Sequence, residues 1–155
     1  VTCFAQAYDI LFDPTKYRPE SRETADHSLP YCLAAAMVDK KITTESFSDE
    51  KLQDPRIYDV IDKIKGEPSQ EFEKMFPAKQ PSRVVITTND GREFSEYLEY
   101  PKGDPREPMT MDDLENKFNS LAGDKFDDTA KATLKENIFN CENKSAYDFM
   151  NDLIV

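Results

Sequence analysis

The 155-residue sequence contains 31 acidic and 20 basic side chains, which gives a formal net charge of −11. Nucleic acids and anionic membranes bind basic surfaces, so this charge argues against both as partners. Hydrophobic residues make up 38% of the sequence, enough apolar material for a buried core, and we expect residues 1–155 to fold as one domain.

Three cysteines, Cys3, Cys32 and Cys141, are too few and too scattered for a disulfide framework or for a zinc or iron–sulfur ligand set. We therefore expect a reduced, cytoplasmic protein without a metal. No apolar run reaches the length of a membrane span, and the first residues lack the pattern of a secretory signal. The sequence starts at Val1 within an apolar run, which suggests a cut in a longer chain.

The first half of the sequence predicts short elements separated by prolines. Residues 1–12 read as a buried strand that runs into a helix, and prolines then favour an extended connection through residues 16–22. Residues 28–38 are typical of a helix capped by Ser28, with a proline in its first turn. Residues 54–62 repeat this opening and predict a short amphipathic helix.

The second half begins with the strongest β signal. Ile64 could extend the preceding helix or begin a short strand, and the strand is the favoured interpretation. Residues 83–88 and 92–100 predict a hairpin that turns at an Asn-Asp-Gly corner. Three helices follow, one from Thr110 to Gly123, one around residues 130–138 and one around residues 145–153. The predicted fold class is α+β, with a small, mainly antiparallel sheet covered by helices.

The chemistry-bearing residues gather just before the helix at residues 28–38. His27, the one histidine, lies there, and a helix N-terminus stabilises a nearby anion by about 0.3–1 kcal/mol. Lys16, Arg18 and Arg22 lie upstream and could hold a carboxylate. Spacing alone leaves an ordinary interpretation open, in which Asp26 and Ser28 cap helices, His27 is structural and the basic residues are solvated.

A resemblance to a known family favours a functional role for these residues over the ordinary structural one. The run Lys16-Tyr-Arg-Pro-Glu-Ser-Arg-Glu-Thr-Ala-Asp-His-Ser-Leu-Pro-Tyr31 closely resembles the signature of the MmgE/PrpD family, which includes 2-methylcitrate dehydratases, cis-aconitate decarboxylases and iminodisuccinate epimerases. Further matches follow in order at residues 47–50, 54–56, 89–91 and 102–118, so the resemblance covers nearly the whole chain.

The resemblance implies a two-part enzyme in which an α+β lid like this chain closes over an all-helical domain, with a tricarboxylate substrate in the cleft between them. It implies an active-site tyrosine in the stretch that matches residues 27–31, so Tyr31 is the first choice for a catalytic residue and His27 the second. Our hypothesis adds substrate-binding roles for Arg22, Asp26 and Ser28. The catalytic base would come from the helical domain, so we expect this chain alone to be inactive.

The form of residues 24–31 looks like the dehydratase branch, which favours dehydration of 2-methylcitrate to 2-methylaconitate by a hydro-lyase of propionate metabolism. Epimerisation of iminodisuccinate and decarboxylation of cis-aconitate stay open, and so does a non-catalytic binding module. The resemblance also implies a homodimer of the complete enzyme. No cofactor is expected, because the cysteines offer no cluster ligands.

Overall fold

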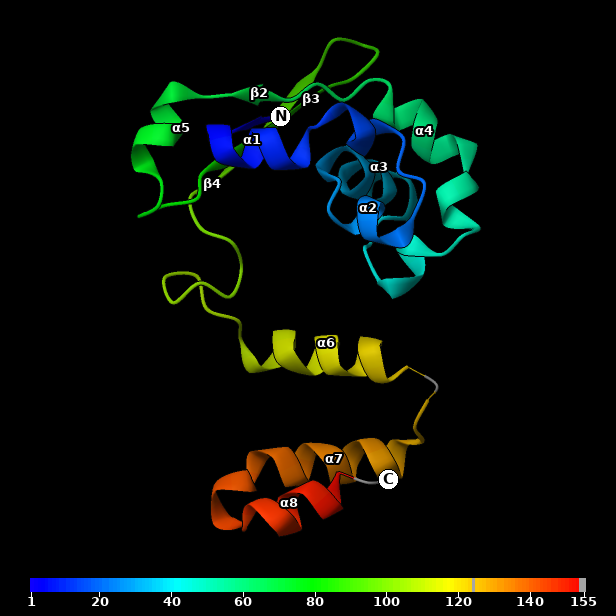
Figure 1. The fold of residues 1–155 in the computed structure, drawn as a ribbon, viewed down its shortest axis with the longest axis vertical. Coiled ribbons are helices and arrows are strands. Elements are labelled where there is room, and N and C mark those ends of the chain that lie inside the picture. Colours follow the sequence, from blue (N-terminus) through cyan, green and yellow to red (C-terminus); the bar gives the residue numbers. More distant parts are fainter. Residues whose placement is uncertain (124, 154–155) are drawn as a thin grey trace. The chain divides into compact units, whose positions relative to one another are not determined.

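The computed structural model describes residues 1–123 and 125–153, which lie in two compact units, Val1–Pro108 and Met109–Val155 (Figure 1). The length and apolar content of the sequence predict one domain, and this stays a prediction, because two compact units can belong to one domain. A loop that contains Pro101, Pro105 and Pro108 leads from the sheet of the first unit to the helices of the second. Proline removes backbone hydrogen-bond donors, so this connection continues neither a strand nor a helix.

A four-stranded sheet organises the first unit, in the order β2-β1-β3-β4. Strand β1 (Thr2–Cys3) pairs in parallel with β2 (Glu67–Pro68) and antiparallel with β3 (Ser82–Thr87). Strands β3 and β4 (Glu93–Leu98) form the predicted hairpin, and Gly91 in its turn has a φ of 84°, which glycine adopts at little cost. The predicted α+β class is confirmed.

Five helices accompany this sheet, and side-chain caps explain where most of them begin. They are α1 (Ala5–Leu11), α2 (Arg22–Asp26), α3 (Leu29–Asp39), α4 (Pro55–Ile61) and α5 (Gln70–Met75). The caps Ser21, Ser28, Asp54 and Ser69 accept backbone N–H bonds at the starts of α2, α3, α4 and α5, respectively. The predicted helices that start after Ser28 and Asp54 are confirmed.

The main core of the first unit lies between α3 and α4. Ala34 and Ala35 of α3 are fully buried, as are Ile57 and Ile61 of α4. Alanine side chains let two helix backbones approach closely, so the alanine-rich stretch of α3 provides the surface on which α4 packs. Tyr31 belongs to the same cluster, which places the start of α3 inside the core.

Three local predictions differ from the structure. Ile64 does not begin a strand, because its N–H donates to Ile61 O at 2.9 Å and so continues the turn after α4; the strand starts after Gly66. Residues 16–22 are only partly extended, since Pro14–Tyr17 forms a 3-10 turn and α2 begins at Arg22. Helix α5 was not predicted, although Ser69 caps it.

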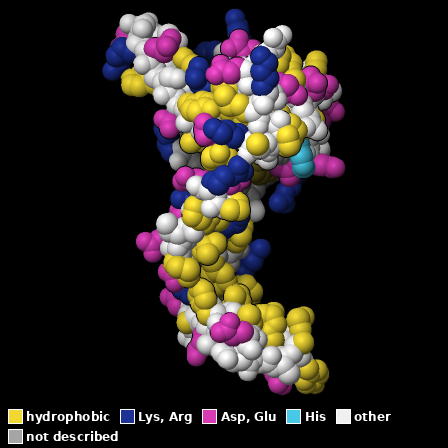
Figure 2. Space-filling model, turned by 90° about the vertical axis from the view of Figure 1, so that its left-hand side faces the viewer, with side chains coloured by type: hydrophobic (Ala, Val, Ile, Leu, Met, Phe, Trp, Pro, Cys, Tyr) yellow, Lys and Arg dark blue, Asp and Glu magenta, His cyan; other side chains and the backbone are white. Residues whose placement is uncertain are grey.

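The second unit consists of α6 (Met111–Ala122), α7 (Asp128–Phe139) and α8 (Ala146–Asp152), as predicted. Thr110 and Asp113 form the expected capping box of α6, and Gly123 follows the helix. Figure 2 shows hydrophobic side chains gathered over this unit, in the lower half of the view, and the exposed ones include Leu114, Leu121 and Phe139. Within the described residues, no helix is long and apolar enough to span a membrane.

Candidate functional site

Ser28 fixes the junction between α2 and α3. Its Oγ accepts the N–H of Tyr31 at 3.0 Å and donates to Lys16 O at 2.6 Å, and the side chain is buried. Pro30, in the first turn, has no N–H to offer. The helix start is therefore occupied by its own cap, and the Ser28 hydroxyl already uses its proton and one lone pair within the protein.

Tyr31 lies in the core beneath this junction. Its side chain is 0% exposed, its Oη donates to Ser46 O at 2.8 Å, and its ring lies 6.0 Å from that of Phe47. Burial raises the pKa of the Tyr31 hydroxyl to about 12, because the phenolate would lose its hydration. A direct catalytic role for Tyr31 stays a prediction, and it requires the hydroxyl to leave Ser46 and reach a substrate.

His27 takes the opposite position, at the surface of the same junction. Its Nδ1 lies 3.0 Å from Glu23 O and 2.5 Å from Asp26 Oδ1, and both oxygens are acceptors, so the arrangement favours a proton on Nδ1. The imidazole is 67% exposed, and Figure 2 shows it beside acidic side chains. The hydrogen bond to Glu23 O and the Asp26 carboxylate raise the pKa of His27, which favours its cationic form.

The three upstream cations have different environments. Lys16 is partly buried, and its carbonyl accepts the Ser28 hydroxyl. Arg18 is 2.5 Å from Asp62 and stacks over the Tyr58 ring at 5.2 Å, which ties it to the region of α4. Arg22 is exposed at the start of α2 and has no ion pair within the described residues. Of the predicted anion-binding residues, Arg22 is therefore the one whose guanidinium is open to a ligand.

The predicted site thus separates into an inner and an outer part. Ser28 and Tyr31 form the inner part and are committed to hydrogen bonds in the core, whereas Arg22, Asp26 and His27 form the outer, exposed part. Helix α2 spans five residues, so Arg22 and His27 lie about 7.5 Å apart along its axis at 1.5 Å per residue. The outer part can bind a carboxylate and exchange a proton.

Ser46 is the contact that the sequence analysis missed. Its carbonyl accepts the Tyr31 hydroxyl, while its own Oγ accepts the N–H of Thr43 at 3.0 Å. The Thr43-x-x-Ser46 spacing, typical of a helical cap, could have indicated an ordered turn here, but no local pattern links this turn to Tyr31. The link exists only in the tertiary structure.

The part of the chain that the structure describes contains no group of three or more His, Cys, Asp or Glu side chains that could hold a metal ion. Cys3 is buried, Cys32 is partly buried and Cys141 is exposed, and all three are free thiols.

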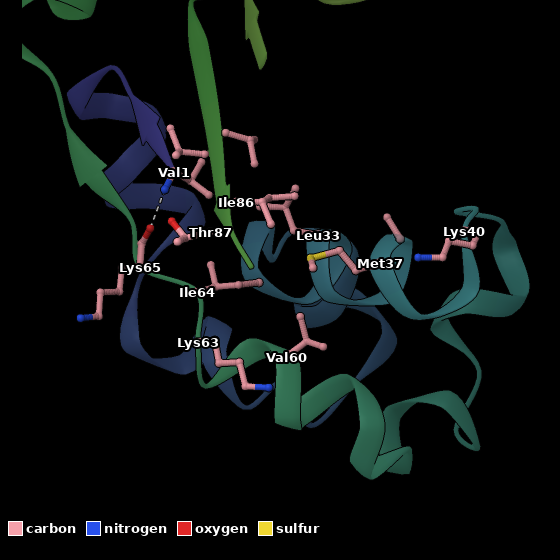
Figure 3. A pocket seen from close by; sticks show the side chains of 13 residues that line it. Val1, Leu33, Met37, Lys40, Val60, Lys63, Ile64, Lys65, Ile86 and Thr87 are labelled. Carbon is pink, nitrogen blue, oxygen red and sulfur yellow. Dashed lines mark hydrogen bonds between the residues drawn. The ribbon is translucent and has the colours of Figure 1, made fainter. Parts of the chain in front are cut away.

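A pocket of about 490 Å³ lies elsewhere in the first unit, between β3, α3 and the segment after α4 (Figure 3). Leu33, Met37, Ile64 and Ile86 contribute to its apolar lining. None of the five predicted site residues borders it. The predicted site and this pocket are therefore separate features of the first unit.

Comparison with known proteins defines the class of this α+β chain. Residues 1–141 match the model of the MmgE/PrpD C-terminal domain, and the chain belongs to the MmgE/PrpD family. This confirms the resemblance of the Lys16–Tyr31 run.

The relatives found are longer proteins. The chain is 32% identical over 114 residues to a cis-aconitate decarboxylase of Aspergillus terreus, which covers 72% of this chain and 23% of that protein. It is 31% identical over 104 residues to the cis-aconitate decarboxylase of Mus musculus, covering 67% and 21%, and 27% identical over 124 residues to that of Homo sapiens, covering 76% and 24%. The chain thus spans about a quarter of the length of these relatives.

Proposed function

We propose that this chain is the lid of a lyase that acts on a tricarboxylate, and that decarboxylation of cis-aconitate is the leading candidate for its reaction. The observation that carries this proposal is the match of residues 1–141 to the MmgE/PrpD C-terminal domain, together with relatives that are cis-aconitate decarboxylases. Because the chain spans only about a quarter of them, the remaining site groups are expected in a helical domain of the same enzyme.

The exposed residues of the predicted site suit this substrate class. A tricarboxylate needs cationic partners, and Arg22 has an open guanidinium that can bind a carboxylate by two parallel hydrogen bonds. His27, with its raised pKa, can hold a second carboxylate or donate a proton. Asp26 orients the imidazole through Nδ1 and leaves Nε2 directed away from this pair.

Decarboxylation breaks the bond between a carboxylate and the carbon skeleton, so the electron pair left behind must be stabilised and a proton must then reach carbon. A positioned proton donor contributes about 10²–10⁴-fold in rate. We assign this donor to His27 or, if its hydroxyl becomes accessible in the closed enzyme, to Tyr31. The other carboxylate ligands are expected in the rest of the polypeptide.

Dehydration of 2-methylcitrate is the second candidate, because the Thr24-Ala-Asp-His-Ser-Leu-Pro-Tyr31 form resembles the dehydratase branch. In dehydration a base, expected in the rest of the polypeptide, removes a proton from the carbon beside a carboxylate, and the hydroxyl group leaves as water; no CO₂ is released. The outer residues would then bind the carboxylates and protonate the leaving oxygen.

The test uses the full-length enzyme with each substrate in turn. Release of CO₂ from cis-aconitate, without loss of water from 2-methylcitrate, supports the leading candidate, and the reverse result supports the second. Arg22→Gln should raise KM several-fold, whereas Arg92→Gln, at the hairpin turn, should leave KM unchanged. Absence of turnover with both tricarboxylates, in a folded full-length protein, would refute the proposal. Turnover of iminodisuccinate would then favour an epimerase, and its absence a non-catalytic module.

A further inference from the structure

Strand β3 is paired unequally along its two edges. On one edge all six residues, Ser82–Thr87, pair with β4, but on the other edge only Ser82 and Arg83 pair with β1. Val85 is 42% exposed and Ile86 38%, although both are apolar and lie in a sheet. The outer half of this edge is therefore a strand surface without a paired strand within the described residues.

The hydrogen-bond pattern shows which backbone groups face this edge. Thr88 N–H donates to Arg92 O at 2.9 Å, so the even-numbered residues of β3 point their N–H and C=O groups toward β4. Alternation then directs the backbone groups of Val85 and Thr87 toward the other edge. Each of these two residues offers one donor and one acceptor to an additional strand.

The 490 Å³ pocket lies directly along this edge. Val84–Thr87 of β3 line one side of it. Figure 3 shows that Leu33, Met37 and Ile64 line the side that faces Ile86. Its lining includes three lysines but no carboxylate side chain. A groove with a free strand edge on one wall and apolar side chains on the other fits an extended peptide segment with alternating apolar side chains.

The register of β1 indicates which segment this is. Thr2 lies opposite Arg83 and Cys3 opposite Ser82, so a continued strand would place the residue directly before Val1 opposite Val85, and the third residue before Val1 opposite Thr87. Val1 N already donates to Lys65 O at 2.7 Å, as an amide would in the continued β1–β2 ladder. A segment that extends β1 upstream of Val1 would therefore run along the groove beside β3.

We propose that the groove is the seat of the segment that immediately precedes Val1 in the complete polypeptide, which continues β1 by about three residues along β3. The second residue before Val1 lies opposite Ile86 and directs an apolar side chain to the same face as Val1 and Cys3. The matched regions cover 23% and 21% of two relatives, so a polypeptide of that length has residues available outside the region described here. The groove is then part of the sheet and not a substrate pocket.

Hydrogen exchange at single-residue resolution tests this pairing in the full-length protein. The amides of Val85 and Thr87 should exchange as slowly as those of Val84 and Ile86, which bond to β4 in either case and serve as internal controls. If Val85 and Thr87 exchange at the rate of unprotected amides while the controls stay protected, the edge is open and the proposal is wrong.

A disulfide then identifies the occupant. Residues in a hydrogen-bonded antiparallel pair have Cα atoms about 5.5 Å apart, which a disulfide can bridge. Cysteine at Val85 (Val85→Cys) and at the residue directly before Val1 should form an intramolecular bridge, identified by peptide mapping. Thr87→Cys with the same upstream cysteine is the matched control and should not cross-link. A bridge between two polypeptides would instead assign the groove to a second copy and overturn the proposal.

Discussion

Tyr31→Phe removes a single hydroxyl group and separates a structural role of Tyr31 from a catalytic one. The hydroxyl donates to Ser46 O at 2.8 Å, and the side chain is fully buried, so the substitution leaves a buried carbonyl without this partner. Such a loss costs about 1–3 kcal/mol of unfolding free energy. We expect this decrease in urea unfolding of the 155-residue chain, with an unchanged slope.

Tyr58→Phe is the matched control, because the Tyr58 hydroxyl donates to Leu52 O at 2.7 Å in the same core. Tyr58→Phe should destabilise the chain by less than Tyr31→Phe, because the Tyr58 hydrogen bond is only partly buried. In the full-length enzyme, a contact of the Tyr31 hydroxyl with substrate would lower kcat by about 10²–10⁴-fold in Tyr31→Phe alone. Equal turnover in the two variants would limit Tyr31 to a structural role. An unfolding free energy of Tyr31→Phe within 0.5 kcal/mol of wild type, on the order of an ordinary surface substitution, would refute the hydrogen-bond argument.

Three further predictions concern the first unit. Gly66→Ala should lower the unfolding free energy by about 1–3 kcal/mol, because a Cβ at this position would lie 2.5 Å from the buried Phe12 ring; urea unfolding measures the change. Ser28→Ala should cost about 0.5–2 kcal/mol in the same assay, because α3 loses its cap. An NMR titration of His27 should give a pKa above the ordinary 6.5, and Asp26→Asn should lower it. His27 therefore favours the folded state at a pH below 6.5, and this contribution is lost as the pH rises through the folded-state pKa.

Matched variants control these predictions. Ser69→Ala removes the cap of the shorter helix α5 and should cost no more than Ser28→Ala. Gly91→Ala has no atom within 4 Å of the new Cβ, so any loss there reports the backbone strain at φ 84° and not a clash. Equal stability of Gly66→Ala and wild type would contradict the packing argument. A His27 pKa at or below 6.5 would contradict the contacts found at Nδ1.

Local sequence patterns predicted those elements of the fold that short-range interactions determine. The hairpin follows from an Asn-Asp-Gly turn between β-favouring residues, and α6 follows from the capping box of Thr110 and Asp113; both are confirmed. The strand β2 was placed at Ile64 instead, because a two-residue strand is defined by its partner β1 and not by its own residues. Short elements that depend on tertiary partners leave little local signal.

The candidate site was predictable only as a set of residues. The motif located Arg22, Asp26, His27, Ser28 and Tyr31, and no pattern in it distinguishes the buried members from the exposed ones. That division depends on the turn between α2 and α3 and on the approach of Ser46, which is 15 residues away from Tyr31. Periodicity within one helix cannot report a contact made by a distant segment.

The placement of His27 and Tyr31 restricts how this motif can take part in catalysis. The two residues are four positions apart, yet the His27 imidazole is 67% exposed, whereas the Tyr31 side chain is fully buried beneath the start of α3. A substrate that binds at the surface meets His27, Asp26 and Arg22 without any rearrangement, whereas contact with the Tyr31 hydroxyl requires the 3-10 turn Thr44–Phe47 to move. If Tyr31→Phe lowers kcat while His27→Gln does not, this turn must open during the catalytic cycle, and faster hydrogen exchange at residues 44–47 in the presence of substrate would show it.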